Sequence, residues 1–373
     1  MSALIVSANG ICVGTLEVEQ GQWKFGYSTE WKDYALSPIF PISTRAFEDT
    51  ANTRTVEWFF ENLLPEGRLR DLIASQDRID PRDTWALLIR HGQDTAGALS
   101  LMPEGYTAAT EEILIPLSQE ALQEKIKASR ARNLPLMASW DGIRMSLAGA
   151  QEKLGLRIDT DGALFLPEGS VPSTHIVKPE NASTDFPYCP ANEFFCMRLA
   201  RELKVSVPNV GLLHLPEPLY VIERFDREPL SAEKGLGRVF RRLHQIDLCQ
   251  TLGVPPSKKY ESEGGLGLHH LFEVLRGTFI ERPIVAANAV VHWIAFNYVG
   301  YPSIYGNATI MKWNQRSQPP SARLPKLGLI IRATTPSFWR GFRMMLPALT
   351  TLTGSAGKTD LHAHRATASK AGA

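Results

Sequence analysis

The order of secondary-structure signals between residues 146 and 227 constrains this fold more than any other feature of the sequence. A small-residue loop, SLAGA, precedes an alternating run that predicts a strand, and GALFLPEG and STHIVKP predict two more. NEFFCMRLARELKV predicts an amphipathic helix and PLYVIERFDR a further strand. This order predicts an α+β fold. The helix residues expected to face inward are Phe194, Phe195, Met197, Leu199 and Leu203.

The first hundred residues predict a small separate α/β domain. Asn9-Gly10 between LIVS and ICVGTLEV predicts a tight hairpin, and WKFGYS predicts a third strand. TVEWFFENLLPEGRLRDLIAS has helical spacing with a break at Pro65, and DTWALLIR predicts a helix before the strand at AGALSLMPEG. Residues from about 106 to 140 are polar and are predicted to be helical. We expect the small domain over 1–115 and a connecting helical segment over 116–139.

Composition indicates a chain with a large core. The 373 residues are 44% hydrophobic, enough for two or three domains. No apolar run reaches eighteen residues, and MSALIVSANG lacks a basic segment followed by a cleavable apolar one, so we expect a cytoplasmic protein without a membrane partner. Cys12, Cys189, Cys196 and Cys249 show no CxxC spacing and are expected to be buried free thiols. The histidine pairs lack clustered cysteines or carboxylates, so no metal site is predicted.

A strand lysine followed by a helix glutamate is the layout of a protein-kinase N-terminal lobe. Phosphoryl transfer requires positioned phosphates and neutralised charge, which such a lobe supplies with a small-residue loop and a lysine–glutamate pair. Lys178 and Glu193 are the candidates. Taken alone, Lys178 is also compatible with a solvated lysine at a strand end, and AGAQEK is compatible with an ordinary turn. The order of the elements favours the kinase interpretation.

Several strings together resemble one family, the HipA serine/threonine-kinase toxins of bacterial toxin–antitoxin modules. The resemblance covers roughly residues 1–300. It rests on ENLLPEG (61–67), DTAGALSLMPEG (94–105), SLAGAQEK (146–153), THIVKP (174–179), NEFFC (192–196), ERFDR (223–227) and CQTLGVPPSKKYESEGG (249–265).

The resemblance implies a site for ATP with Mg²⁺. Lys178 would hold the α- and β-phosphates with Glu193 as its partner, and Ser146 would be autophosphorylated. The hinge at the adenine would comprise Glu223, Arg224 and Phe225. The loop over the phosphates would comprise Ala148, Gly149, Ala150, Gln151, Glu152 and Lys153. The implied partners are a DNA-binding antitoxin and a protein substrate such as an aminoacyl-tRNA synthetase.

The resemblance stops where the catalytic acids are expected. The family places a D-x-H-x-K-N segment and an apolar-Asp-apolar step after an apolar helix, here VVHWIAFNYVG at 290–300. The residues after that helix contain neither, and no aspartate occurs between Asp247 and Asp360. No catalytic residue is identified. We therefore expect a kinase-like domain over 140–302 with a truncated or degenerate C-terminal lobe, followed by an atypical basic tail over 303–373.

The tail differs in charge from the rest of the chain. Residues 303–373 hold ten Lys or Arg and one acid, Asp360, whereas the residues before them hold 30 basic and 38 acidic side chains. Two origins remain open. Lys326–Arg332 and Ala308–Met311 are compatible with codons that encode acid-containing sequences in shifted frames. The basic residues of the tail are scattered among Pro, Ser and Thr and do not fall on one helical face, which favours a frameshift over the alternative, a basic DNA-binding arm. Correspondingly, the chain is either a HipA-like kinase with impaired catalysis or a non-catalytic relic that binds nucleotide, antitoxin or DNA.

Overall fold

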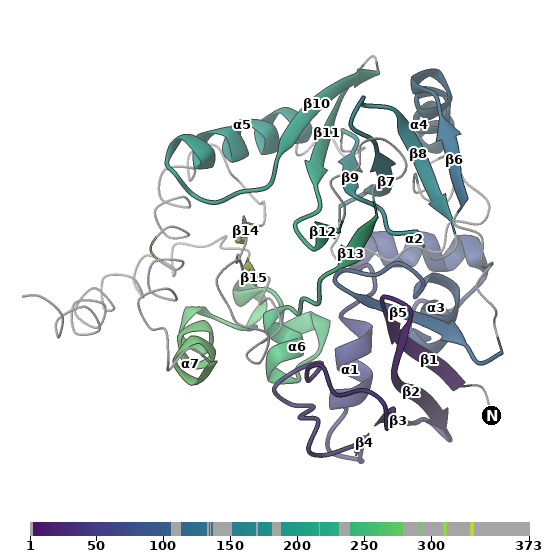
Figure 1. Cartoon of the computed structure of the whole chain (residues 1–373), viewed down its shortest axis with the longest axis vertical. Coiled ribbons are helices and arrows are strands. Elements are labelled where there is room, and N and C mark those ends of the chain that lie inside the picture. The colour runs from purple at the N-terminus through teal and green to yellow at the C-terminus, as the bar shows by residue number, and fades with distance from the viewer. Residues whose placement is uncertain are drawn as a thin grey trace, which may run out of the picture.

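The chain folds around two separate β-sheets. The computed structural model describes residues 3–105, 113–132, 134, 136, 151–168, 171–180, 188–215, 217–230, 239–278, 291, 309–311 and 329–331. One sheet, of five strands, is formed by the first hundred residues, and the other, of six strands, by residues 113–223. Figure 1 shows the two sheets at opposite ends of the molecule, with a short hairpin between them. This mixed helix and sheet architecture agrees with the predicted α+β class.

The first sheet is antiparallel, in the order β4-β3-β2-β1-β5. Its strands are β1 (Ala3–Ala8), β2 (Ile11–Glu19), β3 (Gln22–Tyr27), β4 (Ala46–Glu48) and β5 (Leu99–Pro103). The predicted hairpin at Asn9-Gly10 is confirmed: both residues have positive φ angles, 51° and 81°, as a tight turn between right-twisted strands requires.

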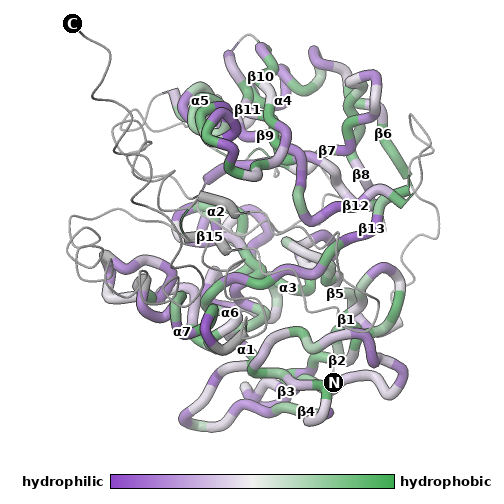
Figure 2. The backbone as a smooth tube through the Cα atoms, turned by 60° about the vertical axis from the view of Figure 1, so that its left-hand side comes forward, coloured by the Kyte–Doolittle hydropathy of each residue, from purple (hydrophilic) through white to green (hydrophobic). Residues whose placement is uncertain are grey.

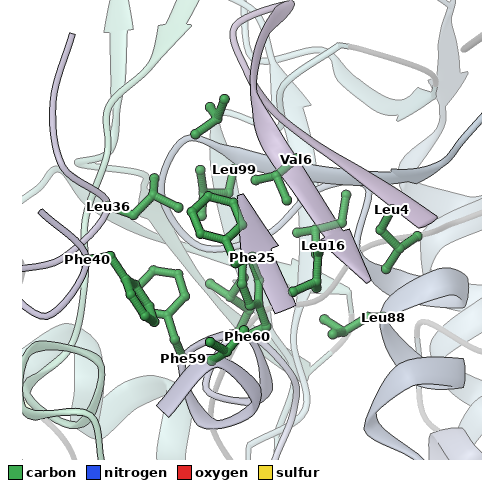
Figure 3. Close-up of a cluster of buried hydrophobic side chains, with 14 of the residues drawn as sticks. Leu4, Val6, Leu16, Phe25, Leu36, Phe40, Phe59, Phe60, Leu88 and Leu99 are labelled. Atoms are coloured by element: carbon green, nitrogen blue, oxygen red, sulfur yellow. The ribbon is translucent and has the colours of Figure 1, made fainter. Parts of the chain in front are cut away.

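Three helices cover this sheet, α1 (Thr55–Glu61), α2 (Gly67–Asp77) and α3 (Thr84–His91). The break predicted at Pro65 separates α1 from α2. Asp49 caps α1, since its carboxylate accepts the amides of Val56 at 2.8 Å and Glu57 at 3.0 Å. Figure 3 shows the aromatic side chains of the core, to which the sheet and helix α1 contribute. The core phenylalanines are Phe25, Phe40, Phe59 and Phe60.

The second sheet has the order β10-β11-β9-β7-β8-β6. Its strands are β6 (Ile113–Leu117), β7 (Leu154–Ile158), β8 (Leu164–Glu168), β9 (His175–Lys178), β10 (Val210–Leu215) and β11 (Glu217–Glu223). Helix α5 (Cys189–Glu202) packs on β10 and β11. Thus β9 lies between β7 and β11, and the helix that follows it returns to the same sheet.

The segment before this sheet differs from the prediction. Residues 113–117 were expected to be helical, but they form β6, which pairs with β8 at the edge of the second sheet. Helix α4 (Gln119–Arg132) follows, and its Leu122 and Ile126 lie in the core of that sheet. ILIPL is a short apolar run without apolar–polar alternation, so pairing with β8 decides its structure. Both elements therefore pack with the second sheet.

The inward face of α5 also differs in part. Phe195 is 55% exposed and Leu203 is 41% exposed, whereas Cys196 and Ala200 are buried. The helix contacts β10 and β11 along one side, and only a narrow stripe of it faces that sheet. Small residues occupy that stripe, and the expectation that Phe195 and Leu203 face inward is wrong.

A connecting region follows the second sheet. It contains β12 (Arg227–Pro229), β13 (Phe240–Arg242), α6 (Leu248–Leu252), the short 3₁₀ helices η3 (Pro256–Lys258) and η4 (Glu261–Glu263), and α7 (Leu268–Thr278). Strands β12 and β13 form the hairpin between the sheets, and the residues there are largely hydrophilic (Figure 2). A last antiparallel pair joins β14 (Thr309–Met311) to β15 (Leu329–Ile331). The remainder of 303–373 lies outside the described residues.

All four cysteines are free. Three are buried as expected, but Cys12 is exposed. Within the described residues, no helix is long and apolar enough to cross a membrane.

Candidate functional site

The centre of the candidate site is an ion pair between β9 and α5. Lys178 is the last residue of β9, and its Nζ lies 2.6 Å from Oε2 of Glu193 in the second turn of α5. The two side chains are only 18% and 13% exposed, so water screens the pair weakly. The structure therefore brings together the two residues that the sequence paired. Their role toward a nucleotide remains a prediction.

Two further contacts fix this pair. The Nζ of Lys178 lies 5.6 Å from the ring centroid of Tyr220, its register partner on β11, at cation–π distance. Tyr220 is buried, and burial raises its pKa above the ordinary value, so the phenol stays neutral. Glu180 accepts the Cys189 amide at 3.0 Å and ties the start of α5 to the end of β9. Strand and helix thus hold the ammonium from both sides.

The predicted phosphate loop is described only in part. Ser146, Ala148, Gly149 and Ala150 lie outside the described residues. Lys153 is buried and Gln151 is half-buried.

Glu152 is anchored beside α4. Its Oε1 accepts the Leu136 amide and, at 3.4 Å, the Ser129 hydroxyl. Burial raises the pKa of the Glu152 carboxyl. The side chain therefore fixes the end of the loop to α4.

The predicted hinge leaves β11 and turns toward the first sheet. The Glu223 amide donates to Asn209 O at 2.9 Å, and the Arg224 amide donates to Thr174 O at 2.8 Å. An adenine ring would therefore have to bind through other groups of 223–225. The Arg224 side chain is 2% exposed and contacts the carboxylates of Asp226 and Asp94 instead. Phe225 is half-buried.

Arg224 belongs to a buried polar cluster that joins the N-terminal sheet to the hinge. We call it the hinge cluster, and its members are Asp94, Ser173, Arg224, Asp226, Arg227 and Arg242. Burial by itself raises the pKa of Asp94, but the guanidiniums of Arg242, Arg224 and Arg227 outweigh it and hold that pKa below its ordinary value. Arg224 and Arg227 lower the pKa of Asp226 in the same way. Asp94 and Asp226 are therefore both ionised.

A second cluster, largely shielded from water, joins the same two parts farther along the chain. Lys259 Nζ lies 2.9 Å from Glu66 Oε1 and 3.1 Å from Asp247 Oδ2, and Tyr260 donates to Glu66 at 3.2 Å. We call these four residues the Glu66 cluster. The sequence predicted neither cluster, although several members lie in ENLLPEG, ERFDR and PPSKKY. The alternating charges of ERFDR are a signal for one cluster, but they do not show which residues pair.

No metal site is present in the part of the chain that the structure describes. There, no three His, Cys, Asp or Glu side chains gather as a metal ion requires. The apolar segment at 290–300 and the residues C-terminal to it lie outside the described residues, apart from Val291 and the short strands β14 and β15.

Comparison with known proteins places this geometry in one family. Residues 4–102 match the HipA N-terminal domain, and residues 145–301 match the HipA-like C-terminal domain. A solved structure of HipA from Shewanella oneidensis, in complex with HipB and its operator DNA, superposes with a TM-score of 0.62 at 30% identity, covering 79% of this chain and 68% of that one. The chain belongs to the HipA family.

Two relatives extend the match. The HipA serine/threonine-protein kinase toxin of Shewanella oneidensis is 33% identical over 285 residues, covering 73% of this chain and 61% of the relative. The Sinorhizobium fredii protein Y4mE is 38% identical over 266 residues, covering 69% of this chain and 60% of the relative. This HipA-family chain thus spans about three fifths of the length of these relatives, and residues 302–373 lie outside both domain matches.

Proposed function

We propose that this HipA-family protein binds ATP at the Lys178–Glu193 pair. The supporting observation is the 2.6 Å contact between an ammonium and a carboxylate that are both largely shielded from water. Such a lysine is oriented by its carboxylate and presents positive charge to the nucleotide phosphates. The family membership supports the same assignment.

The other predicted residues would complete the nucleotide site. The backbone amides of 148–153 would face the phosphates, because small side chains leave them accessible. Glu223, Arg224 and Phe225 would border the adenine. Phosphorylation of Ser146 would add about two negative charges beside the phosphates and disfavour ATP.

We further propose that phosphoryl transfer to a protein serine or threonine is impaired in this chain. The reaction requires a residue that orients the substrate hydroxyl and acids that hold Mg²⁺. The sequence has no aspartate between Asp247 and Asp360, and the described residues contain no cluster suited to Mg²⁺. Because these described residues do not fit Mg²⁺, no step of the reaction is assigned to the metal ion. The alternative proposal is a relic that binds nucleotide or antitoxin without catalysis.

Calorimetric titration of the full chain with ATP tests the site. We expect measurable binding, and Lys178→Ala should weaken it about tenfold or more, because a hydrogen bond to a charged group contributes about 1.5–3 kcal/mol. Lys24→Ala is the matched control, since Lys24 also pairs with carboxylates but lies in the first sheet. Equal affinity in Lys178→Ala and the wild type would exclude Lys178 from the site.

Incubation with radiolabelled ATP tests catalysis separately. Impaired transfer should give no label above that of the Lys178→Ala variant. Clear labelling of Ser146 would show that the chain retains catalysis through acids that the sequence did not reveal.

We propose a DNA-binding antitoxin as the protein partner, by analogy with the complex of HipA with HipB. Co-elution of the purified chain with Shewanella HipB provides a direct assay. A basic tail that binds DNA itself is distinguished by titration with duplex DNA at increasing salt: ten cations acting together give steep salt dependence. An aminoacyl-tRNA synthetase remains the proposed substrate class, from family resemblance alone.

A further inference from the structure

The hinge cluster touches both strands that border the candidate site. Ser173 lies two residues before β9, and its hydroxyl donates to Asp94 Oδ2 at 2.9 Å. Arg224 follows the last residue of β11, and its guanidinium donates to the Ser173 hydroxyl at 2.9 Å. Asp94 therefore lies where the chain enters β9 and leaves β11.

Each acid of the hinge cluster binds more than one guanidinium. Asp94 Oδ1 lies 3.0 Å from Arg227 and 3.3 Å from Arg242. Asp226 Oδ2 lies 2.6 Å from Arg224 and 3.1 Å from Arg227. The cluster thus holds three cations and two anions, and all five side chains are at most 10% exposed. Removing one anion would leave three cations facing a single carboxylate.

Backbone groups of the N-terminal part also contact the hinge. The Gly97 amide donates to Asp226 Oδ2 at 2.8 Å, and the Gly97 carbonyl accepts from Arg227 at 2.9 Å. The Thr95 carbonyl accepts from Arg224 at 3.0 Å. The segment 94–97 therefore binds the hinge through main chain and side chain together.

The connection continues from the hinge to the candidate lysine. The Arg224 amide donates to Thr174 O, and Glu223 pairs with His175 at the start of β9. The same ladder ends at the pairing of Tyr220 with Lys178. Displacement of Arg224 would therefore move β11 relative to β9, and with it the Tyr220 ring that faces the ammonium.

We propose that Asp94, a residue of the N-terminal part, positions the nucleotide site by fixing the entry of β9 to the exit of β11. The site itself rests on the function proposed above. Asp94 touches none of the residues assigned to the phosphates, so it acts through Ser173, Arg224 and Arg227. The N-terminal part is in this respect a structural component of the nucleotide site.

The Glu66 cluster provides a matched control. Glu66, like Asp94, is an acid of the N-terminal part that binds a buried cation of the C-terminal part. Its partners belong to the segment after β13 and do not include the hinge. Glu66→Gln should therefore weaken the contact between the N-terminal and C-terminal parts without changing the contacts of residues 223–227.

The experiment compares Asp94→Asn, Ser173→Ala and Glu66→Gln in the full-length chain. Hydrogen exchange of peptides spanning 217–230, without nucleotide, measures the hinge, and calorimetry measures ATP affinity. In Asp94→Asn we expect about tenfold faster exchange and about tenfold weaker binding, within the usual range of coupling between sites. Ser173→Ala keeps every charge and should show a smaller change in the same direction. Glu66→Gln should stay within about twofold of the wild type in both measurements.

Two results would overturn the proposal. One is hinge exchange and ATP affinity in Asp94→Asn that match the wild type. The other is an equal loss in Glu66→Gln, which would assign the effect to a generally weakened interface. If the wild type itself does not bind ATP, the proposed function fails, and hinge exchange in Asp94→Asn still decides whether Asp94 fixes the strands. If Asp94→Asn does not fold, Ser173→Ala decides by the same two measurements.

Discussion

Replacement of Lys259 by methionine should cause a large loss of stability. Its ammonium lies 2.9 Å from Glu66 and 3.1 Å from Asp247, and the surrounding side chains are 16% exposed or less. Burial lowers the pKa of Lys259, but Asp247 and Glu66 outweigh it and raise that pKa above its ordinary value, so the lysine is charged. Methionine fills a similar volume but leaves two carboxylates without their shared cation. Breaking a buried pair in this way costs about 3–5 kcal/mol.

Urea unfolding at pH 7 measures this loss, with Lys258→Met as the control. Lys258 is the adjacent residue, is exposed, and donates to Gly264 O at 3.2 Å. Its replacement should change the free energy of unfolding by less than about 0.5 kcal/mol. Adding Glu66→Gln to Lys259→Met should recover part of the loss, since one unpaired charge is removed. A loss below about 1 kcal/mol in Lys259→Met would refute the reasoning, because even an exposed ion pair can contribute that much.

Three further predictions concern other buried or exposed groups. Burial lowers the pKa of His244 to about 4. As pH falls from about 6.5 to 4, the unfolded chain binds this proton before the folded chain does, so about 3 kcal/mol of stability should be lost. Urea unfolding over this pH range should show a smaller loss in His244→Gln. Gly97→Ala should lower the melting temperature, because φ is +85° and a Cβ would lie 3.0 Å from Gln245; an unchanged melting temperature would contradict this. Phe195→Ser should leave urea stability nearly unchanged, whereas Phe60→Ala should cost about 3–5 kcal/mol.

The sequence predicted the elements whose signals are local. The Asn9-Gly10 turn needs only its own residues, and Lys178 and Glu193 are fifteen positions apart on neighbouring elements. Strand β6 was missed because its pairing with β8 outweighs its polar surroundings. The outward position of Phe195 depends on how many layers cover α5, which periodicity does not encode.

The buried clusters could not be predicted from the sequence. Asp94 and Arg227 are 133 residues apart, and Glu66 and Lys259 are 193 apart. A charged residue in isolation predicts a solvated side chain, and only the tertiary fold supplies its partner. The same fold buries the Arg224 side chain against Asp94 and Asp226, a pairing that the sequence did not predict.

The segment after β13 has a consequence for the order in which the protein matures. Ile246 is part of the N-terminal core, and His244 donates to the Leu36 carbonyl, 208 residues earlier in the chain. On the ribosome the N-terminal sheet emerges before the second sheet, yet its core lacks Ile246 until all strands of the second sheet have been made. Domains commonly complete their folding in the order of synthesis. Here the first of the two sheets to emerge gains Ile246 only after every strand of the second sheet has been made, and a chain interrupted before residue 246 would expose an unfinished apolar core.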